Sequence, residues 1–172
     1  MKASFLGNGD IAAMRGNELA TDFPARQPLH VLVVEDETLI SLFIENVVCG
    51  LGHEATCAYN VSDALRLVAS MTPVIDAAML DVNLGGAAVF PVAEALSRRG
   101  IPFVFLTGYG RSGVPDCYAE TLVMQKPFSE DDIAFTLAGL RNACSERAAT
   151  RQQSKGSAMF PPPGATVVAG QA

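Results

Sequence analysis

Short runs of apolar, largely β-branched residues alternate along the chain with stretches whose apolar residues recur at helical spacing, and this alternation strongly limits the possible folds. The apolar runs lie at 30–35, 53–59, 77–80, 101–106 and 122–125. Continuous apolar runs of this length are typical of strands buried on both faces. Strands that alternate with helices of ten to fifteen residues form parallel sheets covered by helices. We therefore predict an α/β fold, a doubly wound parallel sheet of five strands.

The helical stretches fill all but one of the connections between these strands. They are predicted at 39–51, 62–72, 88–98 and, after the last strand, 129–144. Ser62 is placed to cap the second of these helices, and Ser129 begins the last. The segment 110–118 breaks the pattern, because Gly113 and Pro115 disfavour a helix. The fourth helix of the fold should therefore be short or irregular.

The chain has 172 residues, enough for one domain with modest tails. Apolar residues make up 49% of it and charged residues 17%, a composition that favours a folded core. We place the domain at 29–147. Residues 1–28 are predicted as a loosely ordered arm, and residues 148–172, which contain a Gln- and Ser-rich stretch followed by three prolines, as a disordered tail.

Charge and cysteine spacing exclude several functions. Residues 29–147 hold fifteen acidic and seven basic side chains, and this excess of negative charge counts against nucleic-acid binding. No apolar run approaches the roughly 20 residues needed to span a bilayer. The four cysteines are scattered, with no zinc-binding spacing, as expected for free thiols in a reducing compartment. We expect a cytoplasmic protein with no membrane or nucleic-acid partner.

Polar side chains follow the predicted strands where they end. Glu35 and Asp36 follow the first strand, Asp81 the third, Thr107 the fourth and Lys126 the fifth. Because the carboxyl ends of parallel strands meet at one edge of the sheet, these side chains should lie close together, at the edge where such folds bind ligands. Each of these residues alone also has a simple structural explanation. Acidic residues favour the first turn of a helix, and a threonine hydroxyl often lies in a turn.

Together these residue types suit phosphoryl transfer. Clustered carboxylates without Cys or His favour Mg²⁺, which works beside phosphate. Asp81, on the central strand, is the natural nucleophile, while Thr107 and Lys126 can donate to phosphoryl oxygens. Glu35, Asp36 and Asp81 would hold the metal, and the backbone carbonyl of Asn83 can reach it as the loop turns.

Four pieces of the sequence, in order, resemble the receiver domain of bacterial two-component response regulators (the CheY-like superfamily). They are VLVVEDE (31–37), MLDVNLGG (79–86), FVFLTGYG (103–110) and QKPF (125–128). The resemblance implies the flavodoxin-like strand order 2-1-3-4-5 and a cis bond before Pro127. It also implies that Glu35 and Asp36 are the acidic metal pair, Asp81 the phosphoacceptor, Thr107 the switch hydroxyl and Lys126 the partner of the phosphoryl group.

Two features depart from the common receiver pattern. Val123 stands where receivers often carry the aromatic residue whose rotation couples to the threonine, and the fourth helical segment is short and glycine-rich. Both features resemble a subgroup whose fourth strand ends in Phe-Ala-Thr-Gly-Tyr-Gly; here the sequence reads FLTGYG (105–110). That subgroup is associated with kinases of the HWE or HisKA2 type. Tyr109 or the loop 108–115 then becomes the candidate moving element.

The resemblance implies a stand-alone receiver that accepts a phosphoryl group from a sensor histidine kinase or a phosphotransfer protein and signals by protein contact or onward relay. We expect no enzymatic turnover beyond slow self-dephosphorylation. One alternative is an interaction module that works without phosphate, to which Val123 and the irregular fourth segment point. Another is an aspartyl-phosphate phosphohydrolase, which Asn83 opposes because the haloacid-dehalogenase type needs an acid at that position.

Overall fold

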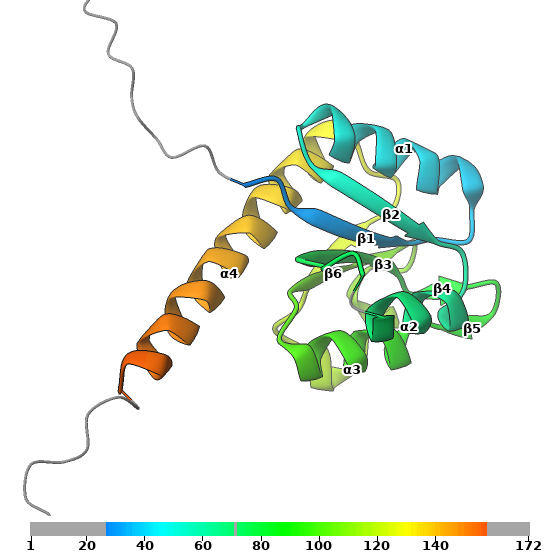
Figure 1. The fold of residues 1–172 in the computed structure, drawn as a ribbon. Helices are drawn as coiled ribbons and strands as arrows, with labels where there is room; N and C mark the ends of the chain where they lie inside the picture. The colour runs from blue at the N-terminus through cyan, green and yellow to red at the C-terminus, as the bar shows by residue number, and fades with distance from the viewer. Residues whose placement is uncertain (1–26, 71, 158–172) are drawn as a thin grey trace, which may run out of the picture.

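The computed structural model describes residues 27–70 and 72–157, and its centre is a parallel five-stranded sheet (Figure 1). The strands are β1 (His30–Val34), β2 (Glu54–Ala58), β3 (Ala77–Asp81), β6 (Phe103–Thr107) and β7 (Leu122–Gln125). Their order across the sheet is β2-β1-β3-β6-β7, and all four neighbouring pairs are parallel. This is the predicted order 2-1-3-4-5, counted over the strands of this sheet.

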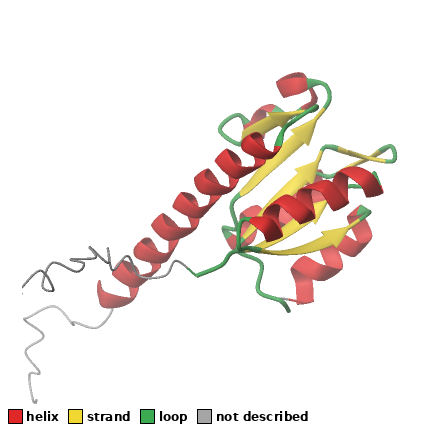
Figure 2. Ribbon diagram, turned by 90° about the horizontal axis from the view of Figure 1, so that it is seen from above, coloured by secondary structure: helices red, strands yellow, loops and turns green. Residues whose placement is uncertain are grey.

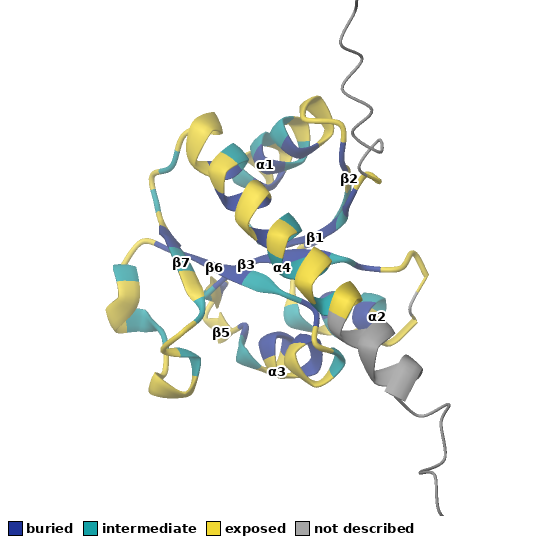
Figure 3. Ribbon diagram, turned by 90° about the vertical axis from the view of Figure 1, so that its left-hand side faces the viewer, coloured by how far each residue is buried: buried dark blue, intermediate teal, exposed yellow. Residues whose placement is uncertain are grey.

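Helices cover both faces of the sheet, which confirms the doubly wound fold. They are α1 (Thr38–Gly50), α2 (Val61–Ser70), α3 (Phe90–Arg99) and α4 (Glu130–Ser157). The first and last lie on one face, and α2 and α3 lie on the other (Figure 3). Among the described residues, no helix combines the length and apolar character needed to cross a membrane.

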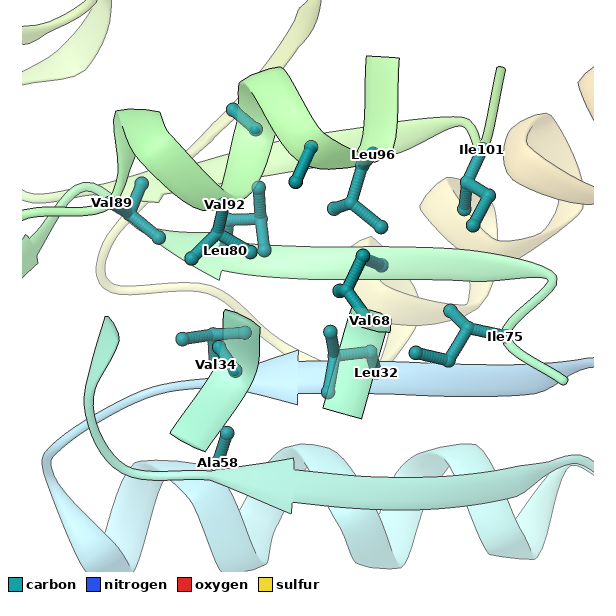
Figure 4. Close-up of a cluster of buried hydrophobic side chains, with 14 of the residues drawn as sticks. Leu32, Val34, Ala58, Val68, Ile75, Leu80, Val89, Val92, Leu96 and Ile101 are labelled. Atoms are coloured by element: carbon teal, nitrogen blue, oxygen red, sulfur yellow. The ribbon is translucent and has the colours of Figure 1, made fainter. Parts of the chain in front are cut away.

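Each face of the sheet has its own apolar core, because alternate residues of a strand point to opposite faces. Leu32 and Val34 of β1 pack toward α2 and α3, in the cluster drawn in Figure 4. Val31 and Val33 of the same strand pack toward α1 and α4. β1 and β3 therefore have to be apolar on both faces, as their continuous apolar runs predict.

A small hairpin follows β3, which the sequence analysis did not predict. Its strands are β4 (Asn83–Leu84) and β5 (Ala87–Ala88), which pair antiparallel. The two residues between them, Gly85 and Gly86, have φ angles of 60° and 94°. A two-residue turn with positive φ at both positions is accessible chiefly to glycine, and a Gly-Gly pair is a known hairpin signal.

The fourth connecting segment has no α-helix, as predicted. It holds two single turns of 3₁₀-helix, η1 (Gly110–Gly113) and η2 (Asp116–Tyr118). Tyr118 anchors the segment, because its ring lies 5.3 to 6.1 Å from the rings of Phe90, Phe103 and Phe105. An aromatic cluster therefore holds this segment where a helix would otherwise pack.

Of the two predicted helix caps, one differs from the cap observed. α2 is capped by Asn60 rather than Ser62, since the Asp63 N–H donates to Asn60 Oδ1 at 2.9 Å and the helix begins one residue before Ser62. α4 begins after Ser129 as predicted, with the Asp132 N–H donating to Ser129 Oγ at 3.3 Å.

The last helix also continues to Ser157, past the expected boundary at 147 (Figure 2). The prediction of a disordered tail was wrong for residues 148–157, where Ala, Arg, Gln and Lys favour helix and no proline interrupts it. The remaining tail, 158–172, lies outside the described residues, as does the predicted arm up to residue 26.

A histidine between the sheet and the last helix gives a pH prediction. The Leu29 N–H donates to His53 Nδ1 at 3.1 Å, while Arg141 Nη2 lies 2.6 Å from His53 Nε2. Burial and the positive charge of Arg141 lower the pKa of His53 below its ordinary value of 6.5. The unfolded chain therefore takes up a proton at this residue before the native protein does. The free energy of unfolding should decrease as the pH falls through about 6.5.

Urea unfolding of the wild type and of His53→Gln between pH 7.5 and 5.5 measures this contribution. We expect the stability of the wild type to fall more steeply with decreasing pH than that of the variant. His30 is present in both proteins, so the difference in slope reports on His53. Equal slopes would contradict the prediction.

Candidate functional site

The polar residues predicted at the strand ends meet at one edge of the sheet. Glu35 and Asp36 directly follow β1, and Asp81 is the last residue of β3. Thr107 is the last residue of β6, and Lys126 directly follows β7. The register aligns these ends, because Val34 is paired with Leu80, Asp81 with Leu106 and Thr107 with Gln125. The parallel sheet alone thus brings four distant segments together.

Lys126 is the centre of the ionic contacts at this edge. Its Nζ lies 2.7 Å from Glu35 Oε2 and donates a hydrogen bond to Asp81 Oδ2 at 3.0 Å. Glu37 Oε1 is 4.0 Å from the same ammonium, although the sequence analysis gave Glu37 no role in the site. The Lys126–Pro127 bond is cis, as the resemblance implied. One ammonium therefore faces several carboxylates.

Burial and ion pairing shift the pKa values of Glu35 and Lys126. Glu35 is fully buried and Asp81 is 6% exposed. Burial raises the pKa of Glu35 from 4.5 to about 7; the hydrogen bond from Lys126 opposes the rise, and the charge of Asp81 adds to it. Burial disfavours the charged form of Lys126, yet its hydrogen bonds to Glu35 and Asp81 raise its pKa above the ordinary 10.5. Lys126 stays cationic but does not balance the negative charge.

The acidic residues fit a divalent cation. Glu35, Asp36 and Asp81 each offer a carboxylate oxygen, and the three oxygens lie within 4.8 Å of one another. These are hard oxygen ligands with no sulfur or imidazole among them, the donor set that Mg²⁺ prefers. A cation there would also offset the Asp81 charge, which adds to the rise that burial causes in the pKa of Glu35. The residues present therefore fit the predicted Mg²⁺ site.

Asn83, whose backbone carbonyl was predicted as a further metal ligand, begins strand β4 beside the acidic residues. Its N–H approaches Asp81 Oδ1 at 3.4 Å, and its side-chain oxygen accepts from the Gly86 N–H at 3.0 Å. The Asn83 side chain thus stabilises the hairpin turn next to Asp81. The metal-binding role of its carbonyl stays a prediction.

Thr107 is buried at the same edge and is tied to the segment that follows it. Its Oγ1 accepts a hydrogen bond from the Tyr109 N–H at 3.0 Å. A Cβ atom added to Gly113 would lie 3.6 Å from this hydroxyl oxygen, so the η1 turn passes close to it. The Tyr109 side chain, by contrast, is 81% exposed. A movement of the Thr107 hydroxyl would therefore break a contact with the 108–115 loop.

Val123 does not fill the space beside this loop. Its side chain is half-buried and packs against the core on the α2 and α3 face. A surface pocket of about 400 Å³ lies next to it, with Gly110, Arg111 and Gln125 in its lining. Arg111 holds this stretch by donating to the carbonyl oxygens of Tyr118 and Thr121.

The sheet order and the residues at its carboxyl edge match the receiver pattern recognised in the sequence. No protein-family model matches the chain. A response regulator receiver domain (CheY-like) from Methylobacillus flagellatus shares the fold, with a TM-score of 0.57 and 21% identity over 66% of this chain and 99% of that one. The chain belongs to the response regulator receiver domains.

Two further solved structures are similar to this chain. SdrG from Sphingomonas melonis Fr1 is 43% identical, with a TM-score of 0.58, and the match covers 66% of this chain and 96% of SdrG. The receiver domain of PhyR from Erythrobacter litoralis is 28% identical, with a TM-score of 0.56, covering 66% of this chain and 89% of that domain.

A curated relative is longer than this chain. It is the phyllosphere-induced regulator PhyR of Methylorubrum extorquens, which is 26% identical over 132 residues, or 75% of this chain. The chain spans 48%, about half, of the length of that relative.

Proposed function

We propose that this receiver accepts a phosphoryl group on Asp81, in an Mg²⁺-dependent reaction, from the phosphohistidine of a sensor kinase or a phosphotransfer protein. An Asp81 carboxylate oxygen attacks phosphorus, and an O–P bond forms as the N–P bond to the donor histidine breaks. The histidine nitrogen keeps the electron pair of the broken N–P bond, and the ring leaves as neutral imidazole because its other nitrogen carries a proton. The phosphoryl group on Asp81 is hydrolysed slowly at most, so the domain acts as a signalling phosphoacceptor rather than an enzyme.

One observation carries the proposal: a nearly buried aspartate at the carboxyl edge of the sheet belongs to a cluster of three carboxylates and contacts a lysine. Asp81 shares the 4.8 Å carboxylate cluster with Glu35 and Asp36, and it accepts a hydrogen bond from Lys126. Bound Mg²⁺ would supply positive charge to the oxygens of the incoming phosphoryl group. Lys126 is placed to donate to a phosphoryl oxygen, and Thr107 to donate to another after a small movement.

A relative supports this proposal. A further solved structure, 42% identical with a TM-score of 0.57, is of the BeF₃-activated conformation of SdrG. Beryllium trifluoride imitates a phosphoryl group on a carboxylate. We infer that the corresponding reaction takes place at Asp81 of this chain.

The output is proposed to be protein contact. A phosphoryl group adds about −1.5 to −2 charge units, which attracts the Thr107 hydroxyl and the Lys126 ammonium. Movement of Thr107 would release the Tyr109 N–H from its hydrogen bond and so reposition the 108–115 loop.

The glycine-rich loop and Val123 favour a kinase of the HWE or HisKA2 type as the phosphoryl donor, and we place the reaction in the cytoplasm.

Magnesium binding and the phosphoryl mimic provide the test. In ¹H–¹⁵N spectra of the full chain, Mg²⁺ should shift the amide resonances of Glu35, Asp36 and Asp81, and BeF₃⁻ should then shift those of 108–115. Asp36→Asn removes one metal ligand and should weaken Mg²⁺ binding at least tenfold, as expected for the loss of about 1.4 kcal/mol.

The control variant for this experiment is Asp63→Asn, which makes the same charge change on α2 and should leave Mg²⁺ binding unaltered. Unchanged 108–115 resonances in saturating Mg²⁺ and BeF₃⁻ would contradict the loop movement. The absence of any response to either reagent would favour an interaction module that works without phosphate.

A further inference from the structure

A second, smaller pocket lies at the opposite edge of the sheet from Asp81. It has a volume of about 270 Å³. Val68, Val74, Ile75 and Ile101 form its apolar lining, and Figure 4 shows Ile75 and Ile101 at the end of the core where the strands begin. Its charged lining consists of three arginines, Arg98, Arg99 and Arg147.

This concentration of positive charge is unusual for the domain. Residues 29–147 contain seven basic and fifteen acidic side chains, and three of the seven basic ones line this single pocket. They come from two elements distant in sequence, the end of α3 and the middle of α4. The fold thus gathers positive charge at one point of an otherwise acidic surface.

The three arginine side chains differ in their ion pairs and hydrogen bonds. Arg98 is paired with Glu94 on the exposed side of α3, at 2.8 Å. Arg147 is half-buried and fixed by a hydrogen bond from its Nη2 to the carbonyl oxygen of Arg99 at 2.8 Å. Arg99 is also half-buried, yet its guanidinium makes no ion pair or hydrogen bond to a described side chain. A guanidinium has five N–H donors, so Arg99 and Arg147 keep donors for a ligand.

The size of the pocket narrows the choice of ligand. Pockets for nucleotides and drug-sized molecules measure roughly 300 to 1,000 Å³, so this one is better matched to a single side chain. Its lining of Val68, Ile75 and Ile101 suits an apolar group, and its arginines suit carboxylates, which guanidinium binds through paired hydrogen bonds. Small pockets that join arginine to apolar surface are typical of the anchoring points of protein interfaces.

We propose that this pocket binds an acidic segment of a protein partner, in which one apolar side chain enters the pocket and flanking carboxylates pair with Arg99 and Arg147. Ile75 lies two residues before β3, and the six residues from it to Asp81 span roughly 20 Å when extended, so the two sites are on opposite edges of the sheet. The partner could therefore stay bound while a kinase approaches Asp81. The proposal does not depend on phosphorylation of Asp81.

Titration of the full ¹⁵N-labelled chain with two capped peptides tests the proposal. The probe is Glu-Glu-Leu-Glu-Glu, and the comparison is Gln-Gln-Leu-Gln-Gln. We expect the acidic peptide to give saturable shifts at Val68, Ile75 and Ile101, and the neutral peptide to give none. Arg99→Gln should weaken binding about tenfold or more, the effect of one charge-assisted hydrogen bond. Because the Arg99 guanidinium makes no ion pair or hydrogen bond to a described side chain, the variant should keep the fold.

The matched control is Arg66→Gln, which removes an exposed arginine from α2, and it should leave peptide binding unchanged. Asp81→Asn should also leave it unchanged, which separates this site from the phosphorylation site. Equal affinity in Arg99→Gln, equal binding of the neutral peptide, or no saturable shifts would overturn the proposal. Shifts of the same size and location with inorganic phosphate would identify a free-anion site and would also overturn it.

Discussion

Asp81→Asn is expected to lose all Mg²⁺-dependent labelling by acetyl phosphate or phosphoramidate. An amide oxygen carries no full negative charge and is a poor nucleophile, whereas the carboxylate at this position is the acceptor in the proposed reaction. The substitution keeps the shape of the side chain, and Lys126 can still donate a hydrogen bond to the remaining oxygen of residue 81. The variant should therefore fold, and the loss of labelling should be chemical rather than structural. Intact-mass measurement of the phosphorylated chain provides the readout.

Asp63→Asn is the matched control for this experiment. Asp63 accepts a hydrogen bond from Arg66 on the surface of α2, far in sequence from the four segments of the site. Its substitution makes the same change of charge and should leave labelling unaltered. Labelling of Asp81→Asn at the wild-type level would show that another residue accepts the phosphoryl group and would refute the proposed role of Asp81.

The position of the candidate site could be predicted because it follows from the direction of the strands. Once five strands are parallel, the residues at the carboxyl ends of β1, β3, β6 and β7 have to meet at one edge, whatever the helices between them do. Asp36, Asp81, Thr107 and Lys126 were placed correctly by that argument alone. The chemical roles of these residues come from their types and from the resemblance to receivers, and they await experiment.

The electrostatic state of the site could not be predicted in the same way. A sequence gives the charge of Glu35, but it does not give the complete burial that raises the pKa of this carboxyl or the 2.7 Å contact with Lys126 that opposes the rise. The two ends of α4 also differ in how well the sequence predicts them. Ser129 is a capping residue visible in the sequence, whereas no glycine or proline between Cys144 and Gly156 marks an end of the helix.

The sequence predicts that the fourth connecting segment is irregular, but it does not predict which contacts hold the segment against the sheet. Gly113 and Pro115 were enough to predict that no α-helix forms there, but they do not say what covers the sheet instead. The answer is the Tyr118 ring, which lies 5.3 Å from Phe105 and stacks on Phe90 with a centroid separation of 6.1 Å. The ring occupies the face of the sheet next to β6.

Phe105→Ala should therefore lower the free energy of unfolding by about 3–5 kcal/mol, the usual cost of removing a fully buried aromatic ring. Phe105 is completely buried in the middle of β6, and its ring meets those of Phe90, Phe103 and Tyr118 at centroid distances of 5.3 to 5.9 Å. Because the domain is expected to have a total stability of about 5–15 kcal/mol, such a loss removes a large share of it. Urea unfolding followed by circular dichroism measures the change.

The same substitution should loosen the fourth segment more than the rest of the domain. Without the Phe105 ring, Tyr118 loses its largest fully buried neighbour, and the amides of η2 should exchange faster than those of β1 in native conditions. Phe135→Ala is the control, since that ring is 80% exposed on α4 and its loss should change stability by no more than about 0.5 kcal/mol. A loss of less than about 1.5 kcal/mol of stability in Phe105→Ala would show that the aromatic cluster does not hold the segment that follows Thr107. An equal increase of amide exchange in η2 and β1 would show the same.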